Sequence, residues 1–292
     1  MHASVAFALM WGVHCPRSVG AAARAHRERL ACLLHFRSGP VVRACFIPAI
    51  TRGLIMRTVR ILAALGLLAA AAAANAEVSS TWTLTNDYDF RGASQSATDP
   101  AIQGSIDYAH ESGWYLGAWA SNVDFGDAVD VNYEVDVYTG FTGSTGEGGL
   151  TWDAGIVYYG YPDDGDFDYL EVYASLAQSW FKGKLWYSND FGGDTTDGDT
   201  SAIYAEANGT FPVGDKFSIL AHVGYSTGDY WDDVYGDDLI DYSLGVGLTL
   251  GNFSLALKYV DTDSDFEVTD DVFNNEGRVI FTIATTLPWK ND

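Results

Sequence analysis

The segment that decides the fold is TLTNDYDFRGASQS, residues 83–96, in which two kinds of side chain alternate. Leu84, Tyr88 and Phe90 occupy one phase of a two-residue period. The other phase holds polar and charged residues, namely Thr83, Thr85, Asp87, Asp89 and Arg91. A period of two is typical of a β-strand whose two faces meet different surroundings. The fold must therefore suit a face of large apolar side chains and a face that carries both acids and a cation.

The same period recurs along the chain after residue 77, where no window has a convincing helical period. The alternation is cleanest around Val135, Val172 and Leu257. In the segment 114–123 aromatic and aliphatic side chains compete for one face, so its phase is ambiguous. The pattern predicts twelve strands, over residues 79–92, 100–110, 114–123, 130–142, 149–161, 168–180, 184–190, 201–211, 216–227, 240–250, 252–260 and 277–289.

The connections between these strands alternate between short turns and long acidic loops. FKGK (181–184) and PVGDK (212–216) are short, whereas GDYWDDVYGDDLID (228–241) is long and acidic. A strict long–short order predicts an up-and-down antiparallel meander with an even number of strands. All long loops then fall on one rim and both termini on the other, which is the arrangement of outer-membrane barrels with short periplasmic turns and long extracellular loops.

Two fold classes compete, a soluble β-sandwich and a transmembrane β-barrel. Strands of about ten residues suit a tilted membrane-spanning strand, whereas soluble strands average about five or six residues. Lys182, Lys184 and Lys216 lie in the short turns, and most acids lie in the long loops. Aromatic residues also bracket the apolar faces, as two girdles at the membrane interfaces would, at Trp82 and Phe90, Trp152 and Tyr158, Phe217 and Tyr225, and Phe253 and Tyr259. We therefore predict an all-β transmembrane barrel of twelve strands.

The segment 56–76, MRTVRILAALGLLAAAAAANA, has the pattern of a Sec signal peptide. Arg57 and Arg60 precede an apolar run that ends in an A-x-A motif, which predicts cleavage between Ala76 and Glu77. A signal of this kind does not normally act deep inside a chain, so we interpret residues 1–55 as an upstream extension from a mis-assigned start. The alternative is a long leader that is also removed. The exported product is then a single domain, residues 77–292.

Charge and cysteine content separate the two parts of the chain. All three cysteines precede Met56, so residues 77–292 have no disulfide and no thiolate metal site. The first 76 residues hold nine of the 16 lysines and arginines and only Glu28 of the 39 acids. Residues 77–292 therefore hold seven cations and 38 acids, a formal net charge of −31. Such a charge opposes binding to nucleic acid, and we expect no cofactor.

The acidic segment 261–272, DTDSDFEVTDDV, begins like an EF-hand loop. Position six is Phe266 instead of glycine and position twelve is Val272 instead of a bidentate glutamate, so it is not an EF-hand. Weak divalent binding by the acidic loops, which would link the rim to lipopolysaccharide phosphates, is one alternative. The other is a set of solvated loops that repel their neighbours.

The segment DYDFRGASQSATDPAIQGSIDYAHESGWYLGAWASNVDF, residues 87–125, resembles the N-terminal signature of the proteobacterial family of TorF-type porins. The members are conserved outer-membrane proteins without an established function, and the strand–loop rhythm is similar over the rest of the chain. The resemblance implies a channel-forming barrel in the outer membrane of a Gram-negative cell, inserted by the barrel-assembly machinery. It implies no substrate. The end of the chain departs from the aromatic ending usual in such barrels, since Trp289 is in phase with Phe281 but three polar residues follow it.

With the apolar phase outward, charged residues of the other phase line the lumen. The predicted pore-lining residues are Asp87, Asp89, Arg91, Glu134, Asp136, Glu171, Glu206, Lys258 and Arg278. One interpretation is a transverse field, with the three cations on one wall facing the acids of the strands opposite. The other is local pairing of Arg91 with Asp89 or Asp87 on its own strand, which contributes about 0–1 kcal/mol and leaves no field.

These features together predict a narrow diffusion channel for small polar or cationic solutes, of unknown oligomeric state. Several aromatic side chains in the inward phase would narrow the pore, namely Tyr138, Tyr159, Tyr161, Tyr173, Trp186 and Tyr204. One alternative is a closed structural or adhesin-type barrel that displays its loops. A less favoured one is an outer-membrane lipid hydrolase, because His110 sits at a short turn and His222 has no serine nucleophile motif around it. We therefore expect no enzymatic activity.

Overall fold

The computed structural model describes residues 76–127, 129–146, 148–195, 200–264 and 271–289. The predicted extension 1–55 and the predicted signal peptide up to residue 75 lie outside the described residues, as does the middle of the EF-hand-like segment. Ala76 and Glu77, the predicted cleavage site, are the first two residues of strand β1.

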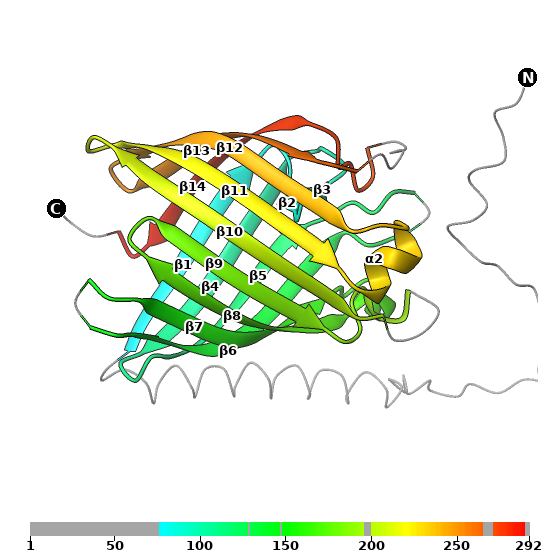
Figure 1. Ribbon diagram of the computed structural model, residues 1–292, viewed down its shortest axis with the longest axis horizontal. Coiled ribbons are helices and arrows are strands. Elements are labelled where there is room, and N and C mark those ends of the chain that lie inside the picture. Colours follow the sequence, from blue (N-terminus) through cyan, green and yellow to red (C-terminus); the bar gives the residue numbers. More distant parts are fainter. Residues whose placement is uncertain (1–75, 128, 147, 196–199, 265–270, 290–292) are drawn as a thin grey trace, which may run out of the picture. The chain divides into compact units, whose positions relative to one another are not determined.

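The described chain forms a closed antiparallel barrel in which every strand pairs with its neighbours in sequence and β1 closes the ring by pairing with both β4 and β14. Figure 1 shows the tilted strands of this barrel. Its twelve strands are β1 (Ala76–Thr85), β4 (Ala101–His110), β5 (Trp114–Asn122), β6 (Tyr133–Ser144), β7 (Thr151–Gly160), β8 (Tyr169–Gln178), β9 (Phe181–Ser188), β10 (Ala202–Val213), β11 (Phe217–Thr227), β12 (Leu239–Leu250), β13 (Phe253–Thr262) and β14 (Arg278–Leu287). The predicted up-and-down topology and strand number are confirmed.

The long connections all lie at one end of the barrel and contain the remaining elements. Figure 1 shows α2 at this end, and β1 begins at the other. The elements are the hairpin strands β2 (Asp89–Phe90) and β3 (Ala93–Ser94), the 3-10 turns η3 (Gly165–Phe167) and η4 (Gly193–Thr195), and the helix α2 (Asp229–Val234). None of the helices in the described residues has the length and apolarity to cross a bilayer.

The outer surface of the barrel wall is apolar and the inner surface is polar. Along β6, Tyr133, Val135 and Val137 are 58%, 39% and 48% exposed, whereas the intervening Glu134 and Asp136 are buried. Comparable exposed aliphatic residues occur on most of the other barrel strands, among them Ile106, Leu185 and Leu244. Soluble monomers rarely expose continuous apolar patches above a few hundred Å². The surface therefore suits contact with hydrocarbon.

Aromatic residues form a row at each end of this outer band. Trp152, Phe217 and Phe253 are exposed near the short turns, at the opposite ends of their strands from Tyr158, Tyr225 and Tyr259. The hydroxyls of these three tyrosines donate hydrogen bonds to aspartates of the loop end, Asp168, Asp238 and Asp261 respectively. Tyrosines with an apolar ring and a wet hydroxyl are suited to a membrane interface. The predicted girdles are confirmed at these positions.

The prediction of one strand over residues 79–92 is wrong beyond Thr85. There the chain leaves the wall and forms the β2–β3 hairpin, whose turn at Arg91 and Gly92 has φ values of 53° and 86°. Tyr88 and Arg91 are buried, and Phe90 contacts the inward-facing ring of Tyr159 edge-on. The alternating pattern therefore spans two structural segments, the end of β1 and the hairpin. In the hairpin, side chains of both phases pack inside the barrel. Phe90 is consequently not part of a girdle.

The hydrophobic core lies inside the barrel at the loop end. Tyr159, Tyr161, Tyr173 and Tyr204 are buried, as the inward phase predicted. In β5, whose phase was ambiguous, Tyr115 also points inward, and its hydroxyl hydrogen bonds to Asp153 at 2.6 Å. Rings from the long loops pack onto the inward rings of β7 and β8. We call these loop residues the mouth cluster: Phe125, Tyr161, Phe167, Phe191, Trp231 and Phe273.

A charge on the outer face should destabilise the barrel according to its depth. Leu244 is exposed in the middle of β12, and Val78 is exposed near the beginning of β1. We expect Leu244→Arg to lower the unfolding free energy in lipid vesicles by about 2–4 kcal/mol and Val78→Arg by about 0–1 kcal/mol, since lipid-facing arginine costs most at the bilayer midplane. Urea titration followed by tryptophan fluorescence measures both values. Equal, small losses would contradict a lipid-facing surface.

Candidate functional site: the barrel interior

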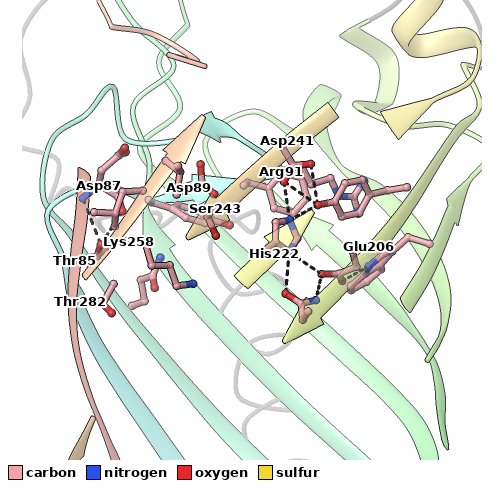
Figure 2. Close-up of a pocket in the computed structure, with 18 of the residues that line it drawn as sticks. Thr85, Asp87, Asp89, Arg91, Glu206, His222, Asp241, Ser243, Lys258 and Thr282 are labelled. Atoms are coloured by element: carbon pink, nitrogen blue, oxygen red, sulfur yellow. Dashed lines mark hydrogen bonds and ion pairs between the residues drawn. The ribbon is translucent and has the colours of Figure 1, made fainter. Parts of the chain in front are cut away.

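The barrel encloses a cavity of about 410 Å³ beneath the β2–β3 hairpin. Its lining comes from both sides of the ring, from Gln103 of β4 and Trp119 of β5 to Trp186 of β9 and Tyr204 of β10. Figure 2 shows charged groups that face one another across it, with Asp87, Asp89 and Lys258 on one side and Glu206, His222 and Asp241 on the other. The cavity is therefore a compartment within the lumen that both charged groups and aromatic rings line.

Arg278, the first residue of β14, fastens the base of the hairpin to the wall. Its Nε donates to Asp87 Oδ2 at 2.5 Å, its Nη2 donates to Asp89 Oδ1, and its Nη1 donates to the Gly92 carbonyl at 2.8 Å. Asp87 accepts a further hydrogen bond from Ser94 Oγ at 2.5 Å. The guanidinium thus binds the first arm and the turn of the hairpin, and Asp87 links it to the second arm through Ser94. Because hydrogen bonds with two charged partners are the strong ones, this group is a principal anchor.

Arg91, at the tip of the hairpin, reaches across the lumen to β8. Its Nη2 donates to Glu171 Oε2 at 2.5 Å, and both side chains are nearly inaccessible, at 5% and 0% exposure. The guanidinium carbon also lies 4.5 Å from the ring centroid of Tyr204 and 5.5 Å from that of Trp186. A cation in this position is held by a carboxylate and by the π faces of aromatic rings.

Tyr88 and two further acids complete the wall that Arg91 approaches. The Tyr88 hydroxyl donates to Glu134 Oε1 at 3.3 Å. Burial is the main cause that raises the pKa of Tyr88 well above its usual value, so the phenol keeps its proton and acts as the donor. Among the described residues, Glu134 Oε2, Asp136 Oδ1 and Glu171 Oε1 are buried without a hydrogen-bond partner. This wall is therefore richer in acceptors than the hairpin can satisfy.

His222 of β11 is the centre of a second network on the cavity wall. Its Nδ1 lies 2.8 Å from Asn208 Oδ1 and its Nε2 lies 2.7 Å from Asp241 Oδ1. The Asn208 amide nitrogen donates to Glu206 Oε2 at 2.7 Å, which turns its oxygen toward the imidazole. Both ring nitrogens are therefore held by side-chain hydrogen bonds, and Nε2 also lies 3.1 Å from the Tyr204 hydroxyl.

The structure separates the predicted pore-lining residues into groups. Asp87, Asp89, Arg91, Glu206 and Lys258 line the cavity. Glu134, Asp136 and Glu171 are buried on the wall behind Arg91, and Arg278 is partly buried against the hairpin. Their role in permeation stays a prediction.

Both predicted arrangements of the charges are wrong for Arg91. It does not pair with Asp87 or Asp89 on its own strand, because those carboxylates bind Arg278. It does not stand on the cationic wall either, because the hairpin carries it across the lumen to Glu171. Burying a guanidinium without a counter-charge is costly. The hairpin, by folding into the lumen, therefore pairs opposite charges that the sequence pattern placed on opposite walls.

Two lumen residues were missed by the sequence analysis, Asp241 and Lys184. Asp241 was assigned to an acidic loop, although its phase relative to the outward Ile240 and Tyr242 places it inside. Lys184 was assigned to a short turn, but it belongs to β9 and its ammonium lies 3.5 Å from the ring centroid of Trp186. In both cases continued alternation in a longer strand was the available signal.

Residues 69–287 match the model of a family described as bacterial protein of unknown function (Gcw_chp). The chain belongs to this family. No curated protein matches this Gcw_chp member. Its fold is similar to that of the NanC porin, with a TM-score of 0.47 and 10% identity over 72% of this chain and 98% of that one.

Two further channel structures are similar. The KdgM porin, solved with disordered oligogalacturonate, has a TM-score of 0.43 and 8% identity over 74% of this chain and 99% of that one. The outer membrane channel DcaP of Acinetobacter baumannii has a TM-score of 0.38 and 10% identity over 74% of this chain and 98% of that one. A likeness of this degree does not carry the solutes of those proteins over to this chain.

Loss of the Arg278 charge should leave the acids of the hairpin without a counter-charge. We expect Arg278→Met to lower the unfolding free energy by about 3–5 kcal/mol, because Asp87 stays buried without its cation. Adding Asp87→Asn and Asp89→Asn should recover part of the lost unfolding free energy, because it removes the uncompensated negative charges. Urea unfolding in lipid vesicles measures all three proteins. A triple variant no more stable than Arg278→Met would contradict this assignment.

Proposed function

We propose that this protein is an outer-membrane channel of a Gram-negative cell that passes small polar or cationic solutes through a narrow acidic lumen. The observation that carries the proposal is the cavity of about 410 Å³, lined by charged side chains as well as rings, inside a closed barrel whose outer face is apolar. A structural barrel needs no such compartment. The finer resemblance to TorF-type porins and the predicted signal peptide at residues 56–76 support the same location.

The described conformation corresponds to a closed state of this channel. The mouth cluster covers the loop end of the interior, and the β2–β3 hairpin crosses the lumen above the cavity. Opening therefore requires the hairpin to move, and with it Tyr88 and Phe90, which pack in the same core as the mouth cluster. Because residues 77–292 carry a formal net charge of −31, the open lumen should favour cations.

The partners of such a channel follow from its surfaces and remain part of the proposal. The outer face suits membrane lipid, and the rim tyrosines and acidic loops lie where lipopolysaccharide headgroups would be. Insertion would use the barrel-assembly machinery. Trp289 is the terminal aromatic available to it, packed at 6.1 Å from the ring of Phe253 and hydrogen bonded to Thr285.

The mouth cluster also favours a second candidate function, a closed barrel that displays acidic loops for structure or adhesion. In that case the interior cavity would be an unused remnant of a packed core. The two candidates differ in one measurable property, ion conduction once the hairpin is released.

Conductance in planar bilayers tests the proposal. We expect refolded residues 77–292 to conduct weakly, and a variant with residues 88–95 replaced by Gly and Ser to conduct several-fold more, with a reversal potential that shows cation preference. The same exchange over the short turn 145–150 serves as the control and should leave conductance unchanged. If neither the wild type nor the hairpin variant conducts ions, the closed barrel is favoured. A preference for chloride would contradict the acidic lumen.

A further inference from the structure

The site around Arg91 is built mainly by the barrel, and the hairpin contributes Arg91 itself and the ring of Phe90, whose centroid lies 4.7 Å from the guanidinium carbon. Glu171 comes from β8, Trp186 from β9 and Tyr204 from β10, so three consecutive wall strands supply a carboxylate and two aromatic faces. Phe191, from the loop after β9, lies 5.4 Å from the guanidinium carbon. These wall residues do not depend on the hairpin for their position, because their strands are held in the ladder on both sides.

We propose that Glu171, Trp186, Phe191 and Tyr204 form a binding site for small organic cations of the guanidinium type, which Arg91 occupies as a tethered ligand. We call these four residues the guanidinium cage. A planar, delocalised and weakly hydrated cation is the group that suits both a carboxylate and stacked π faces. A metal ion would instead need several oxygen ligands around it, and here rings occupy those directions.

The hydrogen-bonding capacity of the wall exceeds what Arg91 provides. Glu171 Oε1 is buried without a partner among the described residues, although its sister oxygen binds Arg91. On β6, which is separated from β8 by β7, Glu134 Oε2 and Asp136 Oδ1 are also buried without a partner among the described residues. Arg91 Nη1 likewise has no hydrogen-bond partner in the described chain. A tethered side chain thus fills the cage with one direct ion pair, whereas a free cation can turn to offer more donors.

The cage borders the interior cavity directly. Arg91, Trp186 and Tyr204 all line the cavity, and Figure 2 shows Arg91 beside Asp241 at its edge. A small cation within this compartment therefore meets the cage without crossing the barrel wall. Glu206, Asp241 and Asp89 on the cavity lining attract such a cation.

Displacement of Arg91 would also release the tip of the hairpin. The Arg278 anchor would still hold its base, so the released segment is short. If the protein is the channel proposed above, this competition makes guanidinium-bearing solutes both the ligand and the opening signal. That consequence rests on the proposed function, whereas binding itself does not.

Emptying the cage tests the site. We expect purified Arg91→Ala barrel in detergent to bind methylguanidinium in isothermal titration calorimetry, and wild-type protein, with the cage filled, to bind it at least about tenfold more weakly. Methylurea, a neutral molecule of nearly the same shape, should not bind, because a cation is required by the carboxylate and the rings. Arg91→Ala combined with Glu171→Gln should weaken methylguanidinium binding at least about tenfold, since it removes the buried counter-charge. Lys216→Ala, in a short turn, is the control and should behave like wild type.

The folding of the variant provides a second readout. If Arg91→Ala does not fold alone, methylguanidinium but not methylurea should restore its refolding yield in detergent, and the Glu171→Gln double variant should not respond. Equal effects of methylguanidinium and methylurea, or no effect of either on binding and yield, would overturn the proposal. These experiments measure binding and yield and not conductance, so they test the binding site independently of the channel. If the barrel binds methylguanidinium but passes no current, the binding-site proposal stands and the channel proposal fails.

Discussion

The pairing of β1 with both β4 and β14 is the constraint on which the rest of this structure depends. Hydrocarbon offers no hydrogen bonds, so an open sheet edge would leave backbone amides and carbonyls unsatisfied at a cost of several kcal/mol each. Closing the ring satisfies them and at the same moment creates two different surfaces. The two-residue period of each strand then sorts side chains between lipid and lumen.

Inside the ring, two kinds of packing divide the space. Toward the loops, aromatic rings from β7, β8 and the long connections form a core that resembles the interior of a soluble protein. Beneath it, carboxylates meet two arginines, a histidine and hydroxyl groups around the cavity. The boundary between these regions is the β2–β3 hairpin, which contributes Tyr88 and Phe90 to the rings and Asp87 and Arg91 to the charges.

Most of the fold could be predicted from the sequence because strand period and loop length are local signals. Each barrel strand occurs where alternation placed it, and the phase of Val135 and Val172 is outward as expected. The hairpin could not be predicted in this way, since TLTNDYDFRGASQS alternates before and after the chain leaves the wall. The partners of Arg91 and Arg278 were missed for a related reason. Their contacts join residues 80 and 191 positions apart, and periodicity carries no information about such pairs.

The close packing around Gly92 has a consequence for the order in which the barrel and the hairpin assemble. A side chain at this position would collide with Thr262 Cγ2 at 2.5 Å and with Asp241 Cβ at 2.7 Å, so the turn packs directly against the paired strands β12 and β13. That surface does not exist until both of these C-terminal strands have joined the sheet. The N-terminal hairpin, although made early, therefore cannot take its final place before then.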